Sequence, residues 1–186
     1  MTTSSARNVF RIHLHFPFVI VFLVVFVLQS SLNAKNVHKL SFHDLEGRQT
    51  RLKDLDGQII VLNFWATWCG PCRAELPRLA ELSKQYPPEK VSFVLLSIDE
   101  KGKFDQVRKF VADQNLSLPV WVGASVNQLE DFSGVNVVPA TLIVDEHGEI
   151  VRAINGEAQP DDVKRVLDWL LAGRKGEAPS ARVKRY

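Results

Sequence analysis

Two cysteines, Cys69 and Cys72, carry the most specific chemical signal in the sequence. They are the chain's only cysteines, and Gly70 and Pro71 stand between them. This spacing is the one that thiol–disulfide exchange requires, because the second sulfur can reach an adduct formed on the first. In that chemistry Cys69 attacks a substrate disulfide and forms a mixed disulfide, and Cys72 then displaces the reduced product.

The cysteine pair stands between two segments of different periodicity. Residues 59–65 are almost entirely apolar and predict a buried strand, whereas residues 71–86 predict a helix with one apolar side. The first N–H groups of a helix are unpaired and its dipole is positive there, so a sulfur at that point is favoured as the reactive thiolate. We therefore expect Cys69 to be exposed at the start of the helix and Cys72 to be more buried, one turn further on.

Two other interpretations of the cysteine pair are weaker. A C-x-x-C can be half of a metal site, but there is no second such pair, and the histidines at 13, 15, 38, 43 and 147 show no ligand spacing. A purely structural disulfide across two residues would constrain the unfolded chain very little. The sequence thus predicts neither a metal nor a cofactor.

The remaining segments alternate between strands and helices. Turn signals at Glu46-Gly47 and Asp56-Gly57 predict a hairpin or two edge strands within residues 36–57. Further strands are expected at 91–98, 118–122, 141–144 and 149–154, and further helices at 102–115, at 126–132 and from Pro160 onward. This order predicts an α/β sandwich with a mixed sheet and helices on both faces.

Residues 1–34 have the layout of a targeting segment. Arg7 and Arg11 precede an apolar run at 16–28, and small and polar residues follow it. A cleavage site ending at Ala34 would place Leu32 where signal peptidase sites have a small residue. A cleaved signal peptide and an uncleaved membrane anchor therefore both remain open, and a buried core helix is a third alternative. Either membrane interpretation places the rest of the chain outside the cytosol, in an oxidising compartment.

The rest of the chain divides into one domain and a tail. The expected domain covers residues 36–172. Residues 173–186 carry five basic groups, one acid and no apolar period, which predicts a disordered basic tail.

Composition and charge argue against a disordered protein and against a nucleic-acid-binding protein. Of the 186 residues, 46% are hydrophobic and 24% are charged, which is typical of a folded globular protein. The net charge of +2 comes entirely from Arg7 and Arg11, so the remaining chain is neutral. A neutral domain argues against a nucleic-acid binder, which needs a basic face to release counterions.

The sequence resembles the thioredoxin superfamily, and in particular its extracytoplasmic TlpA/ResA branch, which is also described as AhpC/TSA-like. The matching stretches are 63–77, 97–99 and 134–145, and the resemblance extends over about residues 36–172. It implies a thioredoxin-like three-layer sandwich with an N-terminal hairpin. It also implies a thiol:disulfide oxidoreductase in the periplasm or at the cell exterior.

The resemblance assigns further residues to substrate binding. Pro139 aligns with the family's cis-proline beside the active sulfurs, although a trans bond would be the default for an isolated X–Pro pair. Together with Val138, it would offer backbone groups to an extended substrate segment. The expected substrate-binding residues are Trp68, Gly70, Pro71, Val138 and Pro139.

Glu75 is the candidate proton acceptor for Cys72. Asn63 stands where cytosolic thioredoxin has a buried aspartate, and an asparagine cannot titrate. Glu75, one turn beyond Cys72, matches an acidic position in the branch that the sequence resembles, so the resemblance implies this role for it. A partly buried carboxylate there would have a raised pKa. The alternative is an ordinary solvated helix glutamate.

The resemblance also implies partners. Relatives of this branch reduce protein disulfides outside the cytosol, including the haem-binding cysteines of apocytochrome c, and a membrane electron donor recharges them. The expected partners are protein disulfides or dithiols, such a donor, and the membrane at the N-terminal segment. Two alternatives are a chaperone-like client-binding module and a thiol peroxidase. Peroxidases of this superfamily place a threonine three residues before the cysteine, whereas here Thr67 is two residues before Cys69.

Overall fold

The computed structural model describes residues 37–185, which belong to the compact unit Lys35–Tyr186. The expected signal peptide or anchor at residues 1–34 lies outside the described residues. Within residues 37–185 the structure contains no helix with the length and apolar character that a membrane span requires.

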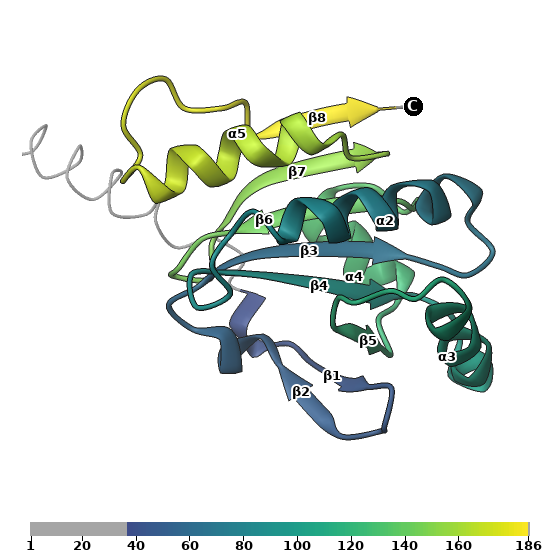
Figure 1. The fold of residues 1–186 in the computed structure, drawn as a ribbon. Coiled ribbons are helices and arrows are strands. Elements are labelled where there is room, and N and C mark those ends of the chain that lie inside the picture. Colours follow the sequence, from purple (N-terminus) through teal and green to yellow (C-terminus); the bar gives the residue numbers. More distant parts are fainter. Residues whose placement is uncertain (1–36, 186) are drawn as a thin grey trace, which may run out of the picture. The chain divides into compact units, whose positions relative to one another are not determined.

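A single eight-stranded mixed sheet forms the centre of the unit (Figure 1). The strands lie in the order β2-β1-β5-β4-β3-β6-β7-β8. Their bounds are β1 Ser41–Asp44, β2 Gln49–Arg51, β3 Ile59–Trp65, β4 Val91–Ser97, β5 Val120–Val122, β6 Ala140–Val144, β7 Ile150–Gly156 and β8 Arg182–Arg185.

The strand directions agree with those predicted from the order of elements. β3 is parallel to β4, and β4 is parallel to β5, so helices must connect them. β6 is antiparallel to both β3 and β7. This register places Thr141 directly opposite Asn63 and Ala140 opposite Phe64.

Four α-helices cover the sheet, with bounds α2 Gly70–Ser83, α3 Phe104–Asp113, α4 Val126–Ser133 and α5 Pro160–Leu171. Short 3-10 turns lie at η2 Val37–Lys39, η3 Leu52–Leu55 and η4 Lys101–Lys103. The α2 and α5 helices lie together along one side of the sheet (Figure 1). The molecule is therefore the expected α/β sandwich, a thioredoxin-like fold.

Both faces of the sheet are buried because the central strands are apolar on both sides. Ile59 and Val61 pack in one cluster with side chains of α2 and α5. Ile60, Leu62 and Phe64 belong to a second cluster, to which α3 and α4 contribute one buried side chain each, Val107 and Leu129. The alternation follows from the period of two along a strand.

The N-terminal hairpin predicted from the turn signal at Glu46-Gly47 is confirmed. β1 and β2 pair antiparallel, and Gly47 adopts φ 82° in the turn between them. A residue with a side chain rarely adopts this conformation, which explains the glycine. The Asp44 carboxylate supports the turn by accepting hydrogen bonds from the N–H groups of Glu46 and Arg48.

The expected disordered tail is wrong for residues 182–185, which form β8. This strand pairs parallel with β7 at the edge of the sheet. Its one apolar side chain, Val183, packs against the cluster that includes the α5 side chains, but a single apolar residue among basic ones gives no hydrophobic periodicity. Arg185 makes an ion pair with the buried Asp162 at 2.8 Å, and at Gly156 a β-carbon would come within 2.3 Å of the Arg185 carbonyl oxygen. The close approach of the two backbones depends on that glycine.

Candidate functional site

Cys69 and Cys72 are joined by a disulfide at the junction of β3 and α2. The chain leaves β3 at Trp65, and a short turn brings it to Gly70, the first residue of the helix. Pro71 occupies the first turn of α2, where its missing N–H leaves no helical hydrogen bond unmade. The strand–helix junction predicted for the pair is therefore present.

Cys69 is the N-cap residue of α2. Its sulfur accepts a hydrogen bond from the backbone N–H of Cys72, with 3.2 Å between the two atoms. A free thiolate at this position would be stabilised by the same N–H group and by the positive end of the helix dipole. The geometry therefore favours ionisation of Cys69 over ionisation of Cys72.

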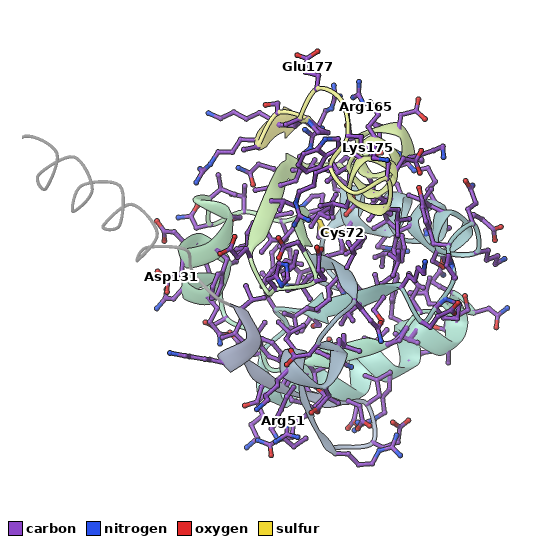
Figure 2. All side chains as sticks on the ribbon, turned by 90° about the vertical axis from the view of Figure 1, so that its left-hand side faces the viewer. Arg51, Cys72, Asp131, Arg165, Lys175 and Glu177 are labelled. Carbon is purple, nitrogen blue, oxygen red and sulfur yellow. A yellow bond between two sulfur atoms is a disulfide. The ribbon has the colours of Figure 1, made fainter. Side chains whose placement is uncertain are left out.

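The exposure predicted for Cys69 is wrong in the oxidised state. Cys69 is only 5% exposed, and Cys72 is fully buried. The disulfide draws the sulfur of Cys69 to Cys72 in the first turn of α2. Both cysteines pack in the same hydrophobic cluster. Figure 2 shows Cys72 deep within the described unit. The predicted order, with Cys72 the more buried residue, is observed.

Glu75 lies one turn beyond Cys72 on α2 and is fully buried. Its Oε1 accepts a hydrogen bond from Nδ2 of Asn63 at 2.6 Å. Its Oε2 accepts one from the backbone N–H of Ala158, also at 2.6 Å. The carboxyl group is therefore held in place between α2, β3 and the segment that joins β7 to α5, and it is not a solvated helix glutamate.

Burial raises the pKa of Glu75 to about 7, although the hydrogen bonds from Asn63 and Ala158 work in the opposite direction. Desolvation disfavours the charged carboxylate, whereas donors stabilise it. A carboxyl group with this pKa exchanges protons near neutral pH. That property is what a proton acceptor for a nearby thiol requires.

Asn63 connects Glu75 to the neighbouring strand. Its Nδ2 also donates to Oγ1 of Thr141 at 2.9 Å, across the β3–β6 pair. Its Oδ1 is buried without a hydrogen-bond partner among the described residues. An asparagine here orients the carboxyl group of Glu75 with an N–H donor and adds no second charge.

Asp99 fixes the turn before the cysteines, a role that the sequence analysis did not assign. This buried carboxylate accepts hydrogen bonds from the N–H and the hydroxyl of Thr67 at 2.9 and 2.8 Å. It also accepts one from the hydroxyl of Ser97 at 2.9 Å. An acid directly after a buried strand was the available signal, because the ends of neighbouring parallel strands meet at one edge of the sheet.

The Val138–Pro139 peptide bond is cis. Pro139 directly precedes β6, in which Ala140 pairs with Phe64 of β3. The proline therefore lies at the end of β3 that leads into the cysteine turn, residues 66–69. Within the described chain, the backbone N–H and C=O of Val138 have no hydrogen-bond partner. An extended peptide could pair with these two groups.

Trp68 stands beside the disulfide and is 70% exposed. It lines a groove of about 660 Å³ together with Thr67, Ile98, Asp99, Glu100, Lys103, Gln106 and Val126. Val126 is also exposed, at 41%. Exposed apolar side chains at a groove are typical of a surface that contacts another molecule. Trp65, in contrast, is fully buried and packs against Phe110 with 5.2 Å between ring centroids.

The sequence also matches known proteins. A family model described as the AhpC/TSA family matches residues 33–153. The thiol-disulfide oxidoreductase ResA of Halalkalibacterium halodurans is 34% identical over 127 residues, which are 68% of this chain and 70% of that relative.

Two solved structures show the same fold. A DsbF homologue from Corynebacterium diphtheriae superimposes with a TM-score of 0.65 at 25% identity and covers 73% of this chain and 87% of its own. The exposed lipoprotein thioredoxin Etrx1 from Streptococcus pneumoniae superimposes with a TM-score of 0.60 at 25% identity, and the match covers 69% of this chain and 97% of Etrx1. Family, fold and a disulfide-bonded cysteine pair at a helix N-terminus agree with one another. The chain therefore belongs to the AhpC/TSA family, as a thioredoxin-like thiol-disulfide oxidoreductase whose redox pair is Cys69 and Cys72.

Proposed function

We propose that this oxidoreductase reduces protein disulfides outside the cytosol. The observation that carries the proposal is the combination of a disulfide at the start of α2 with a buried carboxyl group one turn behind it. A buried carboxyl group with a pKa of about 7 lets the second cysteine lose its proton at neutral pH. That step completes the transfer of electrons to a substrate.

The reaction begins with the reduced enzyme. The Cys69 thiolate attacks one sulfur of a substrate disulfide, forming a bond between enzyme and substrate and releasing the other substrate sulfur as a thiolate. Cys72 then gives its proton to Glu75 and attacks the sulfur of Cys69. The Cys69–Cys72 disulfide forms, the second substrate thiolate leaves, and two electrons have passed to the substrate. The structure has the oxidised product state of the enzyme.

Substrate binding falls to the surface around the disulfide. We assign the contact with an extended peptide to the free backbone groups of Val138 and to the ring of Trp68. Gly70 leaves space over the helix start, since nothing lies within 4 Å of the position of a β-carbon there. Pro71 exposes its ring at the same point. With Pro139 behind the sulfurs, these residues make up the proposed substrate site.

The proposed location and electron supply are supported by the N-terminal segment and the family resemblance. Residues 1–34 would act as a signal peptide or an anchor, with the domain in the periplasm or at the cell exterior. The exposed lipoprotein thioredoxin Etrx1 has the same fold. We further propose that a membrane donor reduces Cys69–Cys72, and that apocytochrome c cysteines are among the substrates.

Two assays test the direction of electron flow. The full chain is equilibrated with glutathione buffers to obtain the potential of the cysteine pair, and insulin reduction is followed for the wild type and for Cys69→Ser. A potential more reducing than that of glutathione, together with loss of insulin reduction in the variant, supports the reductase. A more oxidising potential contradicts it. A client that still binds Cys69→Ser with unchanged affinity, and is not reduced by the wild type, would favour a chaperone-like module instead.

The substrates are identified by trapping. In Cys72→Ser the mixed disulfide between Cys69 and the substrate cannot be resolved, so it accumulates in cells and can be isolated under non-reducing conditions. Trapped apocytochrome c would support the proposed substrate class. The double variant lacking both sulfurs is the control.

A further inference from the structure

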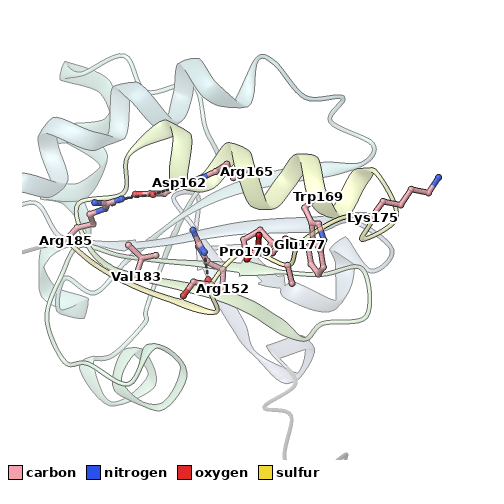
Figure 3. A pocket seen from close by; sticks show the side chains of 11 residues that line it. Arg152, Asp162, Arg165, Trp169, Lys175, Glu177, Pro179, Val183 and Arg185 are labelled. Carbon is pink, nitrogen blue, oxygen red and sulfur yellow. Dashed lines mark hydrogen bonds and ion pairs between the residues drawn. The ribbon is translucent and has the colours of Figure 1, made fainter.

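A second pocket lies at the β8 edge of the sheet, between α5, β7 and the C-terminal segment. It has a volume of about 500 Å³. Figure 3 shows Arg152 standing up from β7 in its centre, with Trp169 on α5 and Pro179 on the C-terminal segment beside it. None of its lining residues takes part in the proposed redox chemistry.

The charges around this pocket do not balance. Its lining includes four cationic side chains, Arg152, Arg165, Lys175 and Arg185, and two carboxylates, Asp162 and Glu177. Asp162 is shared, because Arg165 and Arg185 contact its Oδ1 at 2.9 and 2.8 Å. The pocket therefore carries an excess of positive charge.

Arg152 is the buried cation of this set and has no carboxylate partner among the described residues. Its side chain is only 3% exposed, yet no carboxylate of the described residues lies within ion-pair distance of it. One nitrogen donates to the carbonyl oxygen of Ser180, while the buried Nε has no acceptor in the described part of the chain. Burial lowers the pKa of Arg152, but an arginine remains charged at neutral pH. Burying an unpaired charge is costly unless a counter-charge joins it.

The remaining walls indicate the kind of anion. Trp169 is part of the lining, and its indole N–H is also buried without an acceptor among the described residues. Ala178, Pro179 and Val183 give the pocket an apolar side. Guanidinium groups match the oxygen atoms of phosphate with paired hydrogen bonds, and a net excess of two positive charges suits a dianion.

We propose that this pocket binds a phosphate monoester, with its phosphate group on Arg152 and its organic part against Trp169 and the apolar wall. Such a group can belong to a soluble phosphate ester or to the headgroup of a lipid such as phosphatidic acid. In either case the C-terminal segment from Lys175 to Arg185 closes the site, which gives this segment a function beyond that of an edge strand.

Calorimetric titration of the full-length protein with inorganic phosphate, at constant ionic strength, tests the site. We expect saturable binding of one phosphate. Arg152→Gln should weaken it about tenfold or more, the factor expected for one charge-assisted hydrogen bond. Lys175→Gln should weaken it several-fold, and Glu177→Gln should strengthen it because a repelling carboxylate is removed. Lys175 and Glu177 are exposed, so their variants decide the question if Arg152→Gln does not fold.

Arg51→Gln is the matched control, since Arg51 lies at the opposite end of the unit from Lys175 and Glu177 (Figure 2). Absence of saturable binding would overturn the proposal. Equal weakening by Arg51→Gln and Lys175→Gln would overturn it too, because it would show general screening by charge. Insulin reduction should stay unchanged in all four variants, so this test does not depend on the proposed reductase function.

Vesicles distinguish the two sources of phosphate. Sedimentation with phosphatidylcholine vesicles, with and without phosphatidic acid, is measured for the same variants. Binding that requires phosphatidic acid, falls in Lys175→Gln and is competed by inorganic phosphate assigns the site to a lipid headgroup. Phosphate binding without vesicle binding assigns it to a soluble ester.

Discussion

Glu75 shows how burial can prepare a single side chain for chemistry. Asn63 and the N–H of Ala158 hold its two carboxyl oxygens, while burial raises its pKa to about 7. A carboxylate on the solvent side of α2, with a pKa near the ordinary value of 4.5, would be a weaker base and a poorer acceptor for the proton of a thiol. The position of Glu75 beneath the helix is thus the basis of its proposed role.

Replacing Glu75 with Gln should slow disulfide exchange without unfolding the protein. The amide cannot accept the proton of Cys72, so we expect a rate loss of roughly 100-fold at pH 8. The loss should shrink towards pH 5, where the wild-type carboxyl group is itself protonated. Stopped-flow measurement of mixed-disulfide resolution from pH 5 to 9 checks this, with Glu81→Gln on the exposed side of α2 as the control. Equal rates in wild type and Glu75→Gln at every pH would remove the role.

The same group makes stability depend on pH. Because the folded pKa of Glu75 is about 7 and its unfolded value is 4.5, the folded state binds more protons between these limits. Proton binding by Glu75 therefore stabilises the folded state fully below pH 4.5. This stabilisation is lost as the pH rises to about 7, and the free energy of unfolding falls by roughly 3 kcal/mol at most. Urea denaturation across this range should show a flatter profile for Glu75→Gln.

Asp99 should matter for both stability and rate, because it orients the turn that carries Cys69. Asp99→Ala leaves the N–H of Thr67 and two hydroxyls without their acceptor, which should lower the free energy of unfolding by about 2 kcal/mol. Urea denaturation measures this loss, and Asp54→Ala, which breaks an exposed ion pair with Arg51, provides the comparison. If Asp99→Ala lowered the free energy of unfolding no more than Asp54→Ala, the hydrogen bonds of Asp99 would not be needed to keep the turn in its conformation.

At the residue scale, the sequence predicted the site residues that lie close together along one helix and missed the contacts made between distant parts of the chain. The cysteine pair could be predicted from its spacing at the start of a helix, and Glu75 from its place one turn further on together with the family resemblance. For Asp99 the sequence showed only an acid after a buried strand, and it did not identify the partner Thr67, which is 32 residues away and is reached only because two strands end side by side. The Ala158 N–H, 83 residues from Glu75, was equally out of reach.

At the scale of elements, β8 shows that an edge strand can form without apolar periodicity. Its attachment rests on backbone pairing with β7, on the ion pair between Arg185 and Asp162, and on the absence of a side chain at Gly156. The central strands could be predicted because they are apolar on both sides. A short basic segment has no such signal, since its hydrogen bonds come from the backbone of its neighbour.

Gly156→Ala should release β8 from the sheet. Both this glycine, at φ 95°, and Gly47, at φ 82°, have a backbone that disfavours side chains, so alanine costs about 1 kcal/mol at each. At Gly156 the new methyl group would also collide with the Arg185 backbone, whereas nothing lies within 4 Å at Gly47. Hydrogen exchange of residues 182–185 should accelerate in Gly156→Ala and stay unchanged in Gly47→Ala. Protection retained in both would show that β8 tolerates the methyl group.

At the scale of the molecule, residues Lys35–Tyr186 form a compact unit, and both hydrophobic clusters of the described residues lie in it. Removing residues 1–34 should therefore leave the fold and its redox activity intact. We expect the truncated chain to unfold in one cooperative transition with the urea midpoint and slope of the full chain, and to reduce insulin at the same rate. Loss of the cooperative transition would show that the domain needs its N-terminal segment.

The proposed mechanism depends on Cys69 being the ionised sulfur at the start of α2. The most direct measurement is the rate of iodoacetamide alkylation of the reduced protein as a function of pH, with mass spectrometry to identify the modified cysteine. We predict that Cys69 reacts first, with a pKa clearly below the value of about 8.5 for an unperturbed cysteine. A Cys69 pKa at or above that value, or faster alkylation of Cys72, would contradict the account.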